Sequence, residues 1–194
     1  MTRAEQKENR RKEILFKALD LFVTRGYRET KITDIAESVG MSVGLLFHYF
    51  ESKEALYLEL IKMGSQGTRY PEGLRSLPPE MFFTVFLQSI FDYAKKEPWV
   101  FQMFVLMGQA VKSGPEEAQK IALSGTAVEY SAKIIEEGQK SGVFREGDPI
   151  RLAECFWACV QGVMEQMASI PGFKAPDPKW LTAVLMNDQL TEKC

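Results

Sequence analysis

The sequence predicts an all-α protein, and three observations carry this prediction. Apolar residues recur at intervals of three and four along nearly the whole chain, which is the period of amphipathic helices. The breaks between these segments fall at glycine or proline, for example at Gly26, Gly40, Pro98 and Pro171. No segment shows the alternation of apolar and polar residues that indicates a β-strand, and no internal repeat is present.

Short helices are predicted in the first third of the chain, at residues 8 to 25, 32 to 39, 43 to 49 and from 53 onward. Ser42 and Ser52 stand where an N-cap hydroxyl is expected, and Thr30 does so within a residue of the second helix. Gly26 and Gly40 stand where helices commonly end. The helix at 32 to 39 therefore has both a start and a stop signal, and each of the others has at least one.

A loop or broken helix is expected at residues 64 to 79, which hold three glycines and three prolines. We therefore predict a small N-terminal domain, residues 1 to 55, and a larger helical domain, residues 56 to 194. The helices expected in the larger domain lie at about residues 80 to 96, 98 to 112, 116 to 140, 149 to 169 and 178 to 190.

Composition favours an ordinary folded protein with a cytoplasmic location. Hydrophobic residues make up 45% of the chain, yet no apolar run reaches the roughly 20 residues that span a bilayer, so no membrane partner is expected. The N-terminus lacks the apolar centre of a secretory signal. Cys155 and Cys159, one helical turn apart, are expected to be small core residues rather than metal ligands.

Charge is distributed unevenly. Residues 1 to 62 carry a net charge of +1 and the remainder −3, and a basic cluster lies between Arg3 and Lys12. Such a basic tip suits an anionic partner approached from one end, but it also suits a solvated arm, so charge alone does not decide between them.

The helices at 32 to 39 and 43 to 49, joined by a turn that carries Gly40, have the layout of a helix-turn-helix. In that motif the second helix enters the major groove of DNA. Gly44 near the start of this helix would let its backbone approach base edges closely. Two short helices around a glycine occur in many folds, so the layout by itself is a weak signal.

A longer pattern is far more specific. Residues 30 to 56, TKITDIAESVGMSVGLLFHYFESKEAL, closely resemble the N-terminal signature of the tetracycline-repressor (TetR) family, T-x-x-x-I-A-x-x-x-G-v-s-x-g-x-l-Y-x-y-F-x-s-K-e-x-L. The segment ALDLFVTRGY at 18 to 27 fits the preceding part of that signature. The resemblance implies a helix-turn-helix DNA-binding domain, followed by a helical domain that binds a ligand and dimerises.

Carried over position by position, the resemblance implies that the DNA-binding residues are Thr30, Lys31, Thr33, Ser42, Val43, Gly44, Phe47, His48, Tyr49 and Lys53. Phe47 departs from the family, which usually has tyrosine there; the hydroxyl that reaches phosphate is lost while the packing is kept. His48 is interpreted as a phosphate contact or a structural cap, and Tyr49 as packing or a phosphate contact. Val43 and Leu45 make the helix apolar, which favours contact with thymine methyls and with the backbone over bidentate readout of guanine.

The larger domain is dense in phenylalanine, tryptophan and methionine between residues 81 and 107. An ordinary aromatic core accounts for most of them, but such side chains also line apolar ligand sites. With the resemblance, we predict a pocket for a largely apolar small-molecule effector, with Gln102 or Gln109 as a polar contact. The residues predicted to line it are Phe86, Trp99, Met103, Phe104 and Met107.

The helix at 149 to 169 is apolar on two adjacent stripes, one of which needs a second burial site. We predict a homodimer in which Ala153, Trp157, Val160 and Met164 face the partner, although the sequence does not decide which stripe does so. The resemblance implies a four-helix interface that also uses the helix at 116 to 140. Two recognition helices would then meet successive major grooves of a near-palindromic operator.

The sequence therefore favours a dimeric, ligand-responsive transcriptional regulator, expected to be a repressor. A DNA-binding regulator without an effector is the alternative, and a helical carrier or enzyme is a remoter one. An enzyme is disfavoured because the chain has one histidine, no cluster of metal ligands, no glycine-rich phosphate loop and no nucleophile with a base. No cofactor is expected. The effector, the operator and the regulated genes cannot be read from the sequence.

Overall fold

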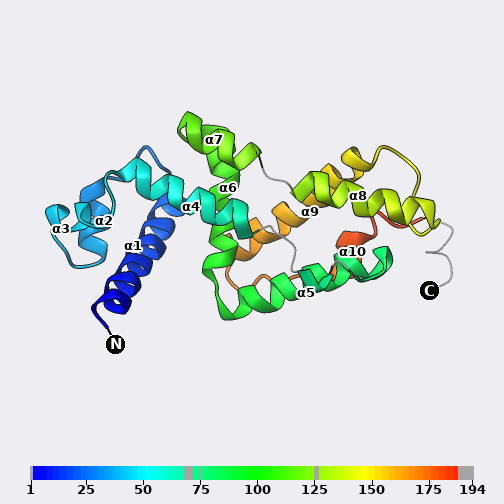
Figure 1. Cartoon of the computed structure of the whole chain (residues 1–194), viewed down its shortest axis with the longest axis horizontal. Helices are drawn as coiled ribbons and strands as arrows, with labels where there is room; N and C mark the ends of the chain where they lie inside the picture. Colours follow the sequence, from blue (N-terminus) through cyan, green and yellow to red (C-terminus); the bar gives the residue numbers. More distant parts are fainter. Residues whose placement is uncertain (1, 68–71, 75, 125–126, 188–194) are drawn as a thin grey trace. The chain divides into compact units, whose positions relative to one another are not determined.

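The computed structural model describes residues 2 to 67, 72 to 74, 76 to 124 and 127 to 187 (Figure 1). Its elements are α1 (Arg3–Arg25), α2 (Ile32–Ser38), α3 (Val43–Phe47), α4 (Lys53–Gly67), the 3-10 helix η1 (Glu72–Leu74), α5 (Pro79–Lys96), α6 (Trp99–Ser113), α7 (Glu116–Leu123), α8 (Ala127–Lys140), α9 (Pro149–Ser169) and α10 (Pro178–Thr182). Within these ranges there is no strand, only an isolated antiparallel bridge between Phe144 and Met186. The all-α prediction is confirmed.

Several helix boundaries differ from those predicted, among them the following three. Helix α1 begins five residues earlier, because Thr2 and Glu5 form a capping box that extends it. The predicted helix at 116 to 140 is two helices, α7 and α8, since α7 ends at Leu123 with Ser124 as its C-cap, and the sequence continues with glycine. Helix α10 ends at Thr182 instead of residue 190, and residues 188 to 190 lie outside the described part of the chain.

The chain divides into two compact units. The first comprises residues 1 to 67 and 102 to 124, and the second comprises residues 68 to 101 and 125 to 194. The domain boundary predicted between residues 55 and 56 lies inside α4, which belongs as a whole to the first unit. The reason is local: Leu56, Leu60 and Ile61 of α4 are fully buried, so the helix cannot be separated from the core it helps to form.

The core of the first unit is built on one face of α1. Its fully buried residues are Ile14, Ala18, Leu19 and Phe22, with Leu15 nearly so. The Phe22 ring meets that of Tyr57 from α4 edge-on at 5.0 Å between centroids. Gln102 and Gln109 of α6 donate hydrogen bonds to Asp20 and to the Val23 carbonyl of α1, so both amides are engaged in holding α6. These contacts fix α4 and α6 against α1.

The second unit has an aromatic core shared by α5, α8 and α9. Phe83 of α5 lies 4.8 Å from Phe156 of α9 between ring centroids, and both are buried. Gly138 of α8 admits the ring of Phe144, because a Cβ at this glycine would stand 2.1 Å from Phe144 Cδ2. The chain after α8 can therefore fold back closely over that helix. No helix of the described ranges is long and apolar enough to cross a membrane.

Candidate DNA-binding surface

Helices α2 and α3 form a tight pair around Gly40 (Figure 1). Gly40 has φ +64°, a left-handed conformation that suits glycine, and the Met41 N–H donates to the Ala36 carbonyl. Ser42 then caps α3, its hydroxyl accepting the Leu45 N–H at 3.2 Å. Leu46 of α3 is fully buried. The turn predicted from Gly40 and Ser42 is therefore present in the form expected of a helix-turn-helix.

The outward face of α3 is set by the burial of Leu46. At 100° per residue, Gly44 and His48 point almost directly away from Leu46, with Leu45 and Phe47 on the two flanks. Leu45 is 47% exposed and Phe47 46% exposed, so both present apolar surface to the outside. A Cβ built on Gly44 meets nothing within 4 Å, so nothing in the protein itself requires glycine there.

The remaining predicted contacts of α3 are distributed around this face. Ser42 and His48 are exposed, while Val43 and Tyr49 are half-buried. Leu45, which the sequence names only as making this helix apolar and suited to thymine methyls, is exposed on the same face. A five-residue helix is too short for periodicity alone to separate its buried from its exposed side.

At the start of α2 the structure corrects one prediction. Thr30 is fully buried, and its hydroxyl donates to the carbonyls of Leu21 and Gly26 at 3.2 and 2.8 Å. Its side chain therefore cannot reach a phosphate. Lys31 and Thr33 are exposed, as a DNA contact requires, but the backbone N–H of Lys31 is taken by the Asp34 carboxylate at 3.1 Å.

Lys53 also turns inward. Its ammonium donates to the Tyr27 and Thr30 carbonyls at 2.7 and 2.9 Å and lies 4.2 Å from the centroid of the Tyr27 ring. Partial burial lowers the pKa of Lys53, while the charge of Glu29 acts in the opposite direction. This cation braces the turn between α1 and α2, so the predicted direct contact with the DNA backbone would require the ammonium to leave two carbonyls.

The basic N-terminal arm, residues 3 to 12, also has some of its cations engaged inside the fold and others exposed. Arg10 donates to the Val39 carbonyl at the end of α2, and Arg11 pairs with the Glu59 carboxylate and lies over the Phe50 ring. The hydrogen bond and charge of Glu59 raise the pKa of Arg11. Arg3, Lys7 and Lys12 are exposed. Arg10 and Arg11 are half-buried, so these three are the cations of the arm that lie most open to solvent.

The residues predicted to line an effector pocket fall in different places. Phe86 is buried in the second unit, 6.0 Å from the Trp157 ring, while Trp99 is half-buried and donates its indole N–H to Glu97. Met103 and Met107 pack in the first unit against Gly64, where a Cβ would stand 2.7 Å from the Met107 sulfur. Phe104 belongs to the first unit too and is half-buried.

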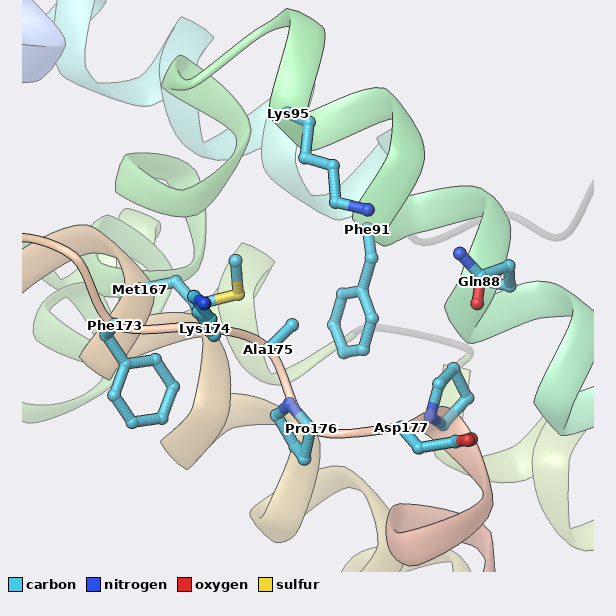
Figure 2. A pocket seen from close by; sticks show the side chains of 10 residues that line it. Gln88, Phe91, Lys95, Met167, Phe173, Lys174, Ala175, Pro176 and Asp177 are labelled. Atoms are coloured by element: carbon cyan, nitrogen blue, oxygen red, sulfur yellow. The ribbon is translucent and has the colours of Figure 1, made fainter.

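A groove of about 480 Å³ lies instead in the second unit, between α5 and the segment that leads into α10 (Figure 2). Figure 2 shows Phe91 pointing from α5 toward the extended segment Phe173–Asp177. The lining residues are Gln88, Phe91, Lys95, Met167, Phe173, Lys174, Ala175, Pro176, Asp177 and Pro178. None of the five predicted pocket residues is among them.

The stripe of α9 assigned to a dimer partner needs revision. Ala153, Val160 and Met164 have no exposed surface within the single chain, so a partner would have nothing of them to cover. Trp157 is half-buried and its indole N–H donates to the Ser131 hydroxyl at 2.9 Å. This stripe faces the protein's own core.

The exposed face of α9 carries small residues instead. Cys155, Ala158 and Cys159 are exposed, and Gly162 is half-buried with open space around the position of a Cβ. The two cysteines were expected in the core, and this expectation was wrong. Small residues could occupy either stripe of an apolar helix, so composition does not distinguish the two.

Helices α1 to α3, with the exposed α3 behind a glycine turn, have the arrangement of a helix-turn-helix DNA-binding domain. The family model described as bacterial regulatory proteins, tetR family, matches residues 14 to 60, the segment that contains this site. No group of three or more histidine, cysteine, aspartate or glutamate side chains in the described ranges could hold a metal ion.

Comparison with known proteins extends this match. The HTH-type transcriptional repressor KstR2 of Rhodococcus jostii (strain RHA1) is 43% identical over 56 residues, which cover 29% of this chain and 28% of that protein. The repressor NicS of Pseudomonas putida is 28% identical over 150 residues, covering 74% of this chain and 70% of NicS. The match therefore spans less than a third of KstR2 but most of NicS.

Solved structures agree over most of the chain. The MbdR regulator from Azoarcus sp. CIB superposes with a TM-score of 0.78 at 26% identity, covering 91% of this chain and 96% of MbdR. The TetR family regulator PfmR from Thermus thermophilus gives a TM-score of 0.73 at 26% identity, covering 89% and 96%. Residues 14 to 60 thus match the tetR family of bacterial regulatory proteins, and the chain resembles regulators of this kind over most of its length. Its relatives are transcriptional regulators and not enzymes, in agreement with the sequence prediction.

Proposed function

We propose that the protein is a homodimeric transcriptional repressor that binds a near-palindromic operator and is released by a small-molecule effector. The observation that carries DNA binding is the outward face of α3, where Gly44 leaves the backbone open between exposed Leu45 and Phe47. Repression is the output named for relatives such as KstR2 and NicS. Action on the chromosome implies a cytoplasmic location.

The DNA-binding part is tested by selection of duplexes from a random library with the full-length protein at low salt. Enrichment of a near-palindrome is expected, bound at least a thousandfold more tightly than arbitrary DNA. Recovery of no preferred sequence would contradict the proposal. A preferred sequence without twofold symmetry would contradict the dimeric arrangement only.

The exposed face of α9 supports a dimer. A glycine inside a helix costs about 1 kcal/mol relative to alanine, and Gly162 has no neighbour in its own chain that requires this. A second copy of α9 approaching closely around Ala158 and Gly162 supplies a reason, because small residues let two helices come together. In this arrangement a twofold axis crosses α9, and the adjacent α8 completes the interface.

Sedimentation of the variant Ala158→Arg tests this interface. The buried arginine would have no partner, so the variant is expected to sediment as a monomer at concentrations where the original protein is a dimer. Ala183→Arg is the matched control, because Ala183 is also exposed but lies after α10. A dimer that survives Ala158→Arg would refute this interface.

The groove beside α5 is the proposed effector site. Its volume of about 480 Å³ suits a small molecule, and Phe91, Met167 and Phe173 give it an apolar wall. Lys95 and Lys174 supply positive charge at its edge, although the Lys95 ammonium also pairs with Asp92 at 3.0 Å. An effector with an apolar body and a carboxylate end fits these groups. Binding would favour a dimer geometry that no longer fits successive major grooves.

Calorimetric titration with benzoate, phenylacetate and octanoate tests this site, with octanamide as the uncharged counterpart of octanoate. At least one carboxylate is expected to bind, to raise the melting temperature and to release operator DNA. Lys174→Gln should weaken the carboxylate and leave the amide unaffected. A protein that binds its operator but responds to none of these compounds would favour a regulator without an effector of this class.

A further inference from the structure

The chemistry of α3 restricts how this protein can recognise DNA sequence. Hydrogen-bonded readout in the major groove relies on arginine, lysine, asparagine, glutamine or an acidic residue. Helix α3 has the sequence VGLLF and contains none of these. The residues that flank it, Ser42 and His48, are the polar side chains nearest to its outward face. Hydrogen bonding from α3 itself is therefore confined to its backbone and these two ends.

What α3 does expose is hydrocarbon. Leu45 is 47% exposed although it lies in a folded unit whose other leucines on α1 and α4 are largely or wholly buried, Leu15, Leu19, Leu56 and Leu60 among them. The one apolar group that bases present in the major groove is the 5-methyl of thymine. Leucine covers such a methyl well, because burial of both removes apolar surface from water.

We propose that Leu45 is a specificity-determining residue that reads thymine 5-methyl groups in each half of the operator. This inference rests on the proposed DNA-binding function and goes further by naming the chemical group that is recognised. Leu45 is the third of the five residues of α3 and lies in its first turn, the part of a recognition helix that contacts base edges. Phe47 is equally exposed but ends the helix on the opposite flank, which places it toward the wall of the groove.

Gly44 makes this contact possible. It precedes Leu45 on the outward face, and its missing Cβ lets the backbone descend until the leucine side chain reaches the base pairs. An exposed leucine on a flat surface would suit a protein partner instead. The gap at Gly44 between Leu45 and Phe47 suits the ridged floor of the DNA major groove better. Substitution of a base analogue in the DNA distinguishes DNA from a protein partner.

The test replaces thymine by deoxyuridine, one position at a time, in the duplex selected from the random library. Deoxyuridine keeps every hydrogen-bonding group and removes only the methyl. Loss of a methyl in contact with Leu45 is expected to weaken binding about fourfold for one half-site and about fifteenfold for both. Thymines elsewhere in the duplex should tolerate the replacement.

Two variants test which side chain of α3 contacts the thymine methyl. In Leu45→Ala the difference between thymine and deoxyuridine duplexes should fall to nearly nothing, whereas Phe47→Ala, matched in exposure, should weaken both duplexes equally. Both side chains are about half exposed, so both variants are expected to keep the melting temperature of the original protein within a few degrees.

Three results would overturn the inference. Deoxyuridine could be tolerated at every position of the half-site, Leu45→Ala could keep the full discrimination, or Phe47→Ala could be the variant that abolishes it. A change of self-association in Leu45→Ala, with no effect on deoxyuridine discrimination, would assign Leu45 to a protein contact and also refute the inference. Failure to select any preferred duplex would overturn the proposed function itself, and the inference with it.

Discussion

Gly44→Ala separates the demands of folding from those of DNA binding. The added Cβ meets nothing within 4 Å in the protein, and Gly44 has no positive φ that alanine would find strained. Alanine is favoured over glycine in a helix by up to about 1 kcal/mol. The variant is therefore expected to be as stable as the original protein or slightly more so.

On DNA the same methyl should be costly. This methyl points away from the buried Leu46 and toward the DNA of the proposed complex. It extends the surface of α3 by about 1.5 Å, the length of one carbon–carbon bond. Hydrogen bonds of about 2.9 Å between the unit and the DNA do not survive such a displacement. Loss of one or two of them, at about 1 to 1.5 kcal/mol each, predicts an operator complex that is about five- to 150-fold weaker.

The assay combines urea unfolding with fluorescence anisotropy on operator and arbitrary duplexes. Gly73→Ala is the matched control, since its Cβ also meets nothing within 4 Å, in a different unit. Unchanged operator affinity in Gly44→Ala would refute the reasoning that this glycine is there for close approach. A loss of folding stability would refute the interpretation of the site as open space.

Three further predictions concern other positions. Phe47→Tyr should tighten operator and arbitrary duplexes alike by about fivefold, because a hydroxyl could then donate to a phosphate; anisotropy showing no gain would place the ring away from the backbone. Gly138→Ala should lower the free energy of unfolding by about 3 kcal/mol in urea titrations, since its Cβ would overlap the buried Phe144 ring, and an unchanged midpoint would mean that the ring moves freely. Burial raises the pKa of Tyr57 to about 12. The neutral buried phenol therefore contributes its full stabilisation of the fold below pH 10, and this stabilisation is lost as pH rises through 12. Between pH 8 and pH 11 the free energy of unfolding should fall by about 1.4 kcal/mol on this account. In Tyr57→Phe the free energy of unfolding, measured in urea at the two pH values, should fall by that much less than in the original protein. An equal fall in both proteins would assign the pH dependence to other groups.

Local signals in the sequence predicted local structure well. Ser42 caps α3 and Gly40 adopts the left-handed turn because caps and turns depend on the few residues around them. The pattern across 116 to 140 was misleading for a related reason. Its apolar spacing continues through the break after α7, so periodicity did not reveal that two helices share it.

The direction of a side chain depends on neighbours that are distant in sequence, and this is where prediction failed. Thr30 was assigned to DNA, yet Leu21 and Gly26 accept its hydroxyl inside the fold. On α9 the packing buries residues of both apolar stripes, Phe156 from one and Ala153 from the other, and leaves Ala158 outside. Residues of similar size and polarity on neighbouring stripes cannot be ranked by composition.

The inward cations link these corrections to function. Arg10, Arg11 and Lys53 all belong to the DNA-binding unit, and each is engaged by a carbonyl, a carboxylate or an aromatic ring of that unit. They hold α2 and the turn after α3 in place, so their contribution to DNA binding is the orientation of α3 more than direct charge. Each phosphate contact makes the slope of log K against log salt concentration steeper by nearly one unit. Arg10, Arg11 and Lys53 would supply that effect only after breaking their internal contacts. Under the proposed function, these three cations contribute less direct charge than the count of basic residues suggests, and the apolar surface of α3 carries a larger share of recognition, so that a single thymine methyl becomes a measurable part of specificity.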